Sequence, residues 1–171
     1  MNLSNLFNQQ RVLDAEIESK HPTQPGEDRL EKKLLALSVE LGECANDWRG
    51  FKFWSENQKA KPTLLEEFID CLHFTLSIGN HLNIRAGILY ELARPVKSET
   101  VEAQFLNATH EIARLHKMNT DKRKGDPTIP YLHLFNTMLG LGEMLGFTWE
   151  DILQAYDEKN AVNHERQKVG Y

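Results

Sequence analysis

Apolar residues recur with the period of an α-helix in almost every segment of the chain, and this feature most limits its fold. Leucines between Leu30 and Leu41 stand at i, i+4, i+7 and i+11, the spacing of a helix face that packs against a core. Alternating patterns typical of strands are weak, and glycines (10) and prolines (6) are few. The pattern therefore predicts an all-α bundle of about six helices.

Six segments carry this periodicity, and each is expected to form one helix. Their approximate ranges are residues 3–18, 28–48, 63–82, 100–117, 131–145 and 148–167. The third segment is apolar on more than one side, which is typical of a central, buried helix. It opens with Thr63-Leu64-Leu65-Glu66, the sequence of a capping box. Residues 84–92 fit either a helix or a loop, and Pro95 ends any helix there.

Size and charge exclude several classes of protein. A chain of 171 residues suits one domain over residues 1–171 and buries a core without disulfides. With 20 Lys and Arg against 25 Asp and Glu, the net charge is −5, so neither nucleic acid nor an anionic membrane is an expected partner. No apolar stretch approaches the roughly 18 residues that span a bilayer, and no secretory signal is visible. Cys44 and Cys71 are expected to be buried free thiols, and the cytoplasm is the expected location.

Four carboxylates flank the apolar faces of two neighbouring helices. Glu40 and Glu43 belong to the 28–48 segment, Glu67 and Asp70 to the next, and each pair is spaced i, i+3. Carboxylates beside large apolar groups are costly unless a positive charge satisfies them. If the pairs converge, they form an oxygen-rich site for a hard cation such as Mg²⁺, which commonly bridges to substrate phosphates. A pair of this kind is also common on a solvated helix face, so the spacing leaves a purely structural role open.

Polar side chains also interrupt two other helices. The last expected helix aligns Tyr156, Lys159, Asn163 and Arg166 on one face. Lys and Arg on such a face can hold phosphate oxygens, Arg in a bidentate manner, although a solvated C-terminal helix gives the same pattern. Near the N-terminus, Gln10 and Asp14 interrupt an apolar stripe, as a hydrated helix edge would.

Together these segments resemble the dimeric all-α dUTPases, a branch of the all-α nucleoside triphosphate pyrophosphatases. The resemblance runs from about residue 6 to the end of the chain. It rests on Gln10-x-x-Leu13-Asp14, Glu40-x-x-Glu43, Glu67-x-x-Asp70-x-x-His73-Phe74 and Lys159-Asn160-x-x-Asn163-x-x-Arg166-Gln167-x-x-Gly170-Tyr171. The carboxylate motif is shared by the whole superfamily, whereas the C-terminal string is specific to this branch.

The resemblance implies a homodimer that hydrolyses dUTP to dUMP and pyrophosphate with Mg²⁺ as cofactor, and leaves activity on dUDP open. Its metal-binding carboxylates map to Glu40, Glu43, Glu67 and Asp70, and Glu43 is the residue expected to activate the attacking water. Its substrate contacts map to Gln10, Asp14, Phe74, Lys159, Asn163, Arg166 and Tyr171. In this mapping Phe74 stacks on the uracil, and Asp14 stands where relatives often have Asn. Either Trp48 or Trp54 is expected to close over the base.

Two other functions remain open at this level. One is a related pyrophosphatase that prefers another nucleotide, such as dCTP, because base specificity rests on a few side-chain contacts. The other is a nucleotide-binding protein without catalysis, against which the four intact carboxylates argue. The charged loop from Asn119 to Pro127 is expected to be the most mobile part of the middle of the chain, and its residues from Lys122 to Asp126 are expected to be solvated rather than to supply charge to the site.

Overall fold

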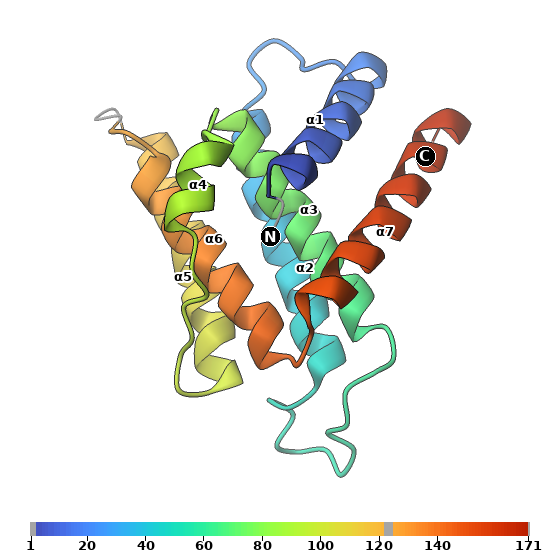
Figure 1. The fold of residues 1–171 in the computed structure, drawn as a ribbon, viewed down its shortest axis with the longest axis vertical. Helices are drawn as coiled ribbons and strands as arrows, with labels where there is room; N and C mark the ends of the chain where they lie inside the picture. The colour runs from blue at the N-terminus through green and yellow to red at the C-terminus, as the bar shows by residue number, and fades with distance from the viewer. Residues whose placement is uncertain (1–2, 122–124, 171) are drawn as a thin grey trace.

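The computed structural model describes residues 3–121 and 125–170. Within these ranges the chain forms seven helices and no strand (Figure 1), which confirms the all-α prediction. The helices are α1 (Leu3–Lys20), α2 (Arg29–Trp48), α3 (Leu64–His81), α4 (Ala86–Leu92), α5 (Val101–Thr120), α6 (Thr128–Met144) and α7 (Trp149–Val169). The ambiguous segment 84–92 thus contains the short helix α4. Part of the segment expected to be mobile, residues 122–124, and Tyr171 lie outside the described residues.

Helix α3 is the centre of the bundle, as its pattern predicts. It packs against α1, α2, α6 and α7, and eleven of its residues are buried. A Cβ at Gly79 would come within 2.4 Å of the Tyr131 hydroxyl oxygen and 2.8 Å of the Phe7 ring. Because glycine has no side chain, α1 and α6 approach α3 closely at this turn. Cys44 and Cys71 are buried and free, as expected.

The N-terminus of α3 lacks the predicted capping box. Thr63 makes no side-chain capping bond, so the predicted capping box with Glu66 is wrong. Its hydroxyl donates instead to the buried carboxylate of Asp47, which also pairs with Lys61. A charged acceptor makes a stronger hydrogen bond than a neutral one, and this one holds the start of α3 against the end of α2. Glu66 is left to point toward α7.

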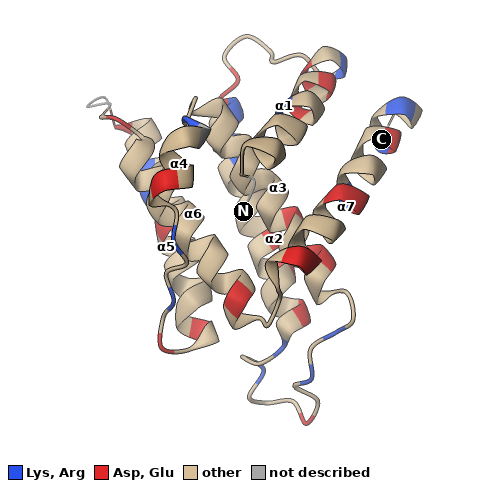
Figure 2. Ribbon diagram, viewed as in Figure 1, with Lys and Arg blue, Asp and Glu red and all other residues tan. Residues whose placement is uncertain are grey.

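Helices α1, α2, α3 and α7 position the residues discussed below. Helix α7 packs against α1 and α3, beside the main bundle (Figure 1). Figure 2 shows acidic residues along α2 and α3, and a gathering of Lys and Arg in the loop between these two helices. None of the helices in the described ranges is both long and apolar enough to cross a bilayer.

Candidate active site

A cavity of about 1120 Å³ opens between α1, α2, α3 and α7. It brings together residues from sequence segments that are up to 157 positions apart, because α7 returns to α1 at the end of the chain. The predicted site residues that line it are Gln10, Asp14, Glu40, Glu43, Glu67, Asp70, Phe74, Lys159, Asn163 and Arg166. Tyr171, the remaining predicted residue, lies outside the described part of the chain.

Three of the four predicted metal ligands converge at one side of this cavity. Glu40 of α2 and Glu67 and Asp70 of α3 each offer a carboxylate oxygen, and these oxygens lie within 4.8 Å of one another. Such a set of oxygen donors fits a hard divalent cation. Glu43 is exposed and lines the same cavity one turn further along α2, but it does not belong to this group of three.

Burial and neighbouring acidic side chains raise the pKa of these three carboxyl groups. Burial and the nearby charges of Asp70, Glu43 and Glu67 raise the pKa of Glu40 to about 7. Burial also raises the pKa of Glu67 and of Asp70. Desolvation and like charges both disfavour the ionised form. A bound cation relieves both effects, so the electrostatics of the cluster favour a cation beside these side chains.

Lys159 of α7 brings a positive charge into contact with the cluster. Its buried ammonium donates to Asp70 Oδ2 at 2.6 Å and to Glu66 Oε1 at 2.8 Å. Burial lowers the pKa of Lys159, but the bonds to these two carboxylates outweigh that effect and raise it overall. Sequence reasoning missed Glu66, although its spacing of i, i+4 from Asp70 places both side chains on one helix face.

A buried hydrogen-bond network joins α1, α3 and α7 beside the carboxylates. Gln10 Nε2 donates to Asp14 Oδ1 at 3.0 Å, which fixes the orientation of the amide because a carboxylate only accepts. Gln10 Oε1 then accepts from the Tyr156 hydroxyl at 2.9 Å and faces His73 Nδ1 at 2.8 Å. The proton of His73 therefore lies on Nδ1. Burial and the Lys159 charge lower the pKa of His73 to about 3, so the ring is neutral.

Two acceptor atoms of this network have no hydrogen-bond donor among the described residues. They are Asp14 Oδ2 and His73 Nε2, both buried, and both residues line the cavity. The other oxygen of Asp14 also accepts from Ser77 Oγ at 2.7 Å. Buried acceptors without donors are costly, so the cavity suits a ligand that donates at two points. Ser77 was missed by sequence reasoning, although it lies two turns beyond Asp70 on the same face of α3.

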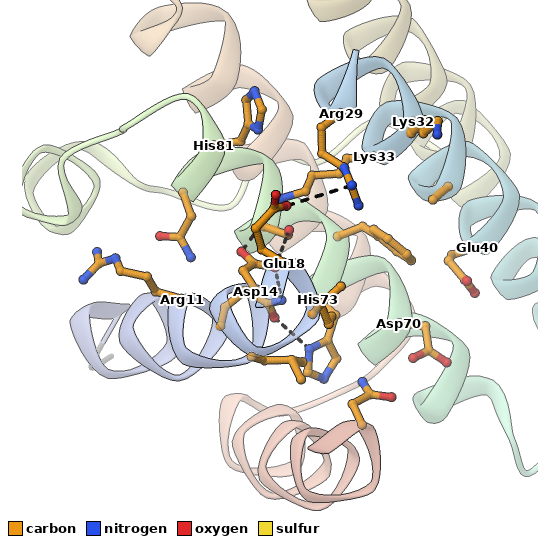
Figure 3. A pocket seen from close by; sticks show the side chains of 18 of the residues that line it. Arg11, Asp14, Glu18, Arg29, Lys32, Lys33, Glu40, Asp70, His73 and His81 are labelled. Carbon is orange, nitrogen blue, oxygen red and sulfur yellow. Dashed lines mark hydrogen bonds and ion pairs between the residues drawn. The ribbon is translucent and has the colours of Figure 1, made fainter. Parts of the chain in front are cut away.

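The carboxylates and the unpaired acceptors lie at successive levels of α3. Asp70, His73 and Ser77 are spaced i, i+3, i+7, and Phe74 lies between these levels, partly buried against the core. At 1.5 Å rise per residue, Ser77 is about 10 Å along the helix from Asp70. Figure 3 shows Glu40 and Asp70 facing the cavity together, apart from Asp14. An elongated ligand can therefore contact both groups at once.

The C-terminal helix forms the remaining wall. Arg166 Nη1 donates to Asn163 Oδ1 at 3.2 Å, and both residues line the cavity as expected. His164 pairs with Glu16 of α1, and Lys20 bonds the backbone oxygen of Gln167. These contacts hold the far end of α7 against α1.

Neither candidate tryptophan lines the described cavity. Trp48 packs against the core, where its ring centroid is 5.7 Å from that of Phe105. Trp54 is 65% exposed and contacts the rings of Phe51 and Phe53 in the loop between α2 and α3. Closure of a tryptophan over the base thus stays a prediction.

Comparison with known proteins assigns the chain to a family. No curated protein matches the chain. The family model described as dUTPase matches residues 2–171, a range that includes the acidic cluster, the Gln10 network and the C-terminal string. The match confirms the resemblance inferred from the sequence, and membership implies hydrolysis of dUTP to dUMP and pyrophosphate. The chain belongs to the dUTPase family.

Proposed function

We propose that this dUTPase performs its reaction in the cavity between α1, α2, α3 and α7, with Mg²⁺ held by Glu40, Glu43, Glu67 and Asp70. The observation that carries the proposal is the convergence of three of these carboxylates within 4.8 Å. Their raised pKa values support it, because a cation is what favours their ionised forms. When bound, Mg²⁺ lowers the pKa of a coordinated water and stabilises charge on phosphoryl oxygens.

Glu43 is the residue proposed to take the proton from the attacking water. It lines the cavity one turn from Glu40 and stands outside the group of three. A carboxylate on a rigid helix that lies beside the cation, and therefore near the water that the cation activates, is suited to act as a general base.

Lys159 and Arg166 are proposed to contact the phosphates from the α7 side. Both line the cavity, and Lys159 already lies against the carboxylates, at 2.6 Å from Asp70. Arg166 is two turns further along α7, so the two positive charges lie on the same wall of the cavity at different positions along the helix. The C-terminal Tyr171 is proposed as a third phosphate contact on the basis of the family resemblance.

The nucleoside is proposed to lie at the Gln10–Asp14 side of the cavity. The nucleoside part of dUTP has two hydrogen-bond donors, N3–H of uracil and the 3′-hydroxyl group. The hydrogen-bond network around Gln10 has two buried acceptors without a hydrogen-bond donor, Asp14 Oδ2 and His73 Nε2, as many as the nucleoside has donors. Phe74 stacks on the base, and Asn163 contacts the nucleoside from α7. In this orientation the triphosphate extends toward the carboxylates.

We also propose that the chain acts as a homodimer in the cytoplasm. Large apolar side chains are exposed on adjacent helices, including Leu35 and Val39 of α2 and Leu106 of α5. Such side chains are typical of surfaces that a second chain covers. Light scattering tests the proposal, because a dimer has about twice the 19.7 kDa mass of one chain. A mass near that of one chain would contradict it.

Pyrophosphate release from each deoxynucleoside triphosphate and from UTP, with Mg²⁺ or with EDTA, tests the proposed reaction. Release from dUTP that requires Mg²⁺ is the expected result. Release mainly from dCTP would retain the metal site but assign another base to the pocket. Binding of dUTP without release would instead support a catalytically silent protein.

A further inference from the structure

Lys159 of α7 is a buried cation that two carboxylates of α3 share. Its side chain is 10% exposed, and its ammonium donates to Glu66 Oε1 at 2.8 Å and to Asp70 Oδ2 at 2.6 Å. The two acceptors are one helical turn apart, so they receive the ammonium together. A lysine ammonium has three donors, and its hydrogen bonds to described residues use two of them. The third donor can serve a ligand in the cavity that Lys159 lines.

The two acceptors differ in what else they can hold. Asp70 belongs to the group of three carboxylates whose oxygens converge, and Glu66 does not. The Glu66 side chain is also 57% exposed, against 20% for Asp70, although both line the cavity. A carboxylate that binds a divalent cation attracts an ammonium less, and the cation itself repels the ammonium. Of these two partners of Lys159, only Glu66 therefore remains fully available when a cation binds to the cluster.

Burial makes the remaining partner necessary. An ion pair with both groups exposed contributes little to stability, but the cation of this pair is buried, and a buried charge without a partner is strongly unfavourable. Glu66 also interacts with the second cation of this wall, because the hydrogen bond and charge of Lys159 and then the charge of Arg166 lower its pKa. Both cations line the cavity. Glu66 is thus the carboxylate that the phosphate-facing side of α7 has in addition to the cluster.

We propose that Glu66 is a positioning residue, which holds the Lys159 ammonium in place for the phosphates while Asp70 binds the cation. This inference deepens the proposed function and rests on it. In the structure, Glu66 and Asp70 share the ammonium. When Asp70 turns to the cation, Glu66 keeps one N–H of Lys159, and the donor released by Asp70 becomes free for a phosphate oxygen. Glu66 contacts neither the cation nor the phosphates, so its effect on the substrate passes through Lys159.

The first test measures ligand binding to Glu66→Gln by calorimetry in Mg²⁺. The affinity for α,β-imido-dUTP, an analogue that resists hydrolysis, should fall about tenfold, whereas deoxyuridine, which has no phosphate, should bind as it does to wild type. Glu158→Gln is the matched control. Glu158 precedes Lys159 in the chain, is exposed and accepts from Gln154 at 3.0 Å, so this variant should bind both ligands normally. Equal losses for the two ligands, equal losses in the two variants, or no loss would overturn the inference.

The second test is a double-mutant cycle with Lys159→Met, which keeps the length of the side chain but removes the ammonium. Because Glu66 acts through Lys159, Glu66→Gln should weaken binding of the imido analogue about tenfold in the wild-type background and less than about twofold in the Lys159→Met background. The same loss in both backgrounds would show that Glu66 acts independently of Lys159 and would overturn the inference. Urea unfolding checks that Lys159→Met is folded, and the first test does not depend on this variant.

Pyrophosphate release separates a failure of this inference from a failure of the proposed function. Glu66→Gln should lower kcat/KM for dUTP by about the factor found in binding, about tenfold, and Glu158→Gln should leave it unchanged. If wild-type protein releases no pyrophosphate from dUTP, the proposed function fails. If wild type hydrolyses dUTP and Glu66→Gln matches it in both release and binding, only the present inference fails.

Discussion

Replacing Glu40 by Gln should stabilise the metal-free protein at alkaline pH. The pKa of Glu40 is raised from 4.5 to about 7 by burial and by its acidic neighbours. For a fully buried group, a shift of this size means that ionisation lowers the free energy of unfolding by about 3 kcal/mol. Glu40 is only half-buried, and solvent screening reduces the effect to about 1–2 kcal/mol. Gln has nearly the same volume without the charge, so the variant should gain this amount.

The size of this effect depends on pH. Below pH 4.5 the carboxyl group is protonated in both the folded and the unfolded protein, and it contributes no penalty. As pH rises toward 7, the unfolded chain ionises more readily than the folded one, so the wild-type protein loses stability. Above about pH 7 the penalty is complete and constant. The Glu40→Gln variant should therefore be more stable than wild type at pH 8 and as stable as wild type at pH 4.

Urea unfolding in EDTA measures the difference. At pH 8 the midpoint for Glu40→Gln should be higher by about 0.5–1 M, whereas exposed Glu56→Gln should change stability by less than about 0.5 kcal/mol. Saturating Mg²⁺ should stabilise wild type more than the variant, because Gln provides no negative charge to the cation. The electrostatic reasoning would be refuted if the variant were no more stable than wild type at pH 8, or if its gain in stability at pH 4 were as large as at pH 8.

Three further variants test the other parts of the site. Glu43→Gln should bind dUTP almost as wild type does but lose turnover; appreciable activity would exclude it as the base. Arg166→Ala should raise KM and lower kcat together in steady-state assays, and unchanged values of both would exclude it from the phosphate contacts. Tyr156→Phe removes a buried donor to Gln10 and should lower the free energy of unfolding by about 1 kcal/mol in urea. Unchanged stability would indicate that the Gln10 carbonyl is already satisfied by His73.

The periodicity of apolar residues predicted most of the fold. Residues 28–48 and 148–167 were expected to be helical, and α2 and α7 confirm both. Their N-terminal boundaries were also readable, because Asp28 and Thr148 cap the two helices through their side chains. The capping box at Thr63 failed because a buried carboxylate from another helix, Asp47, competes for its hydroxyl. Local sequence could not reveal that competitor.

The sequence predicted which residue types form the site, but not which charged groups pair with one another. Spacing identified four carboxylates on neighbouring helix faces, and three of them converge because α2 and α3 pack side by side; the four are Glu40, Glu43, Glu67 and Asp70. It also assigned Lys159 to phosphates, whereas the folded chain without substrate pairs its ammonium with Asp70. Charge alone cannot choose between a carboxylate and a phosphate as the partner of a lysine.

By itself, the sequence determined the helices and the acidic faces, since both depend on spacing along the chain, and its motifs carried the resemblance to the family that the family model confirms. Only the tertiary structure decided which atoms of the site remain unpaired. The tautomer of His73 follows from the amide orientation of Gln10, and that orientation follows from Asp14. The 3.9 Å distance between Asp14 and Lys33 depends on how α1 and α2 each pack against α3. Hydrogen-bond roles are set by distances between helices, and these distances exist only once the bundle has formed.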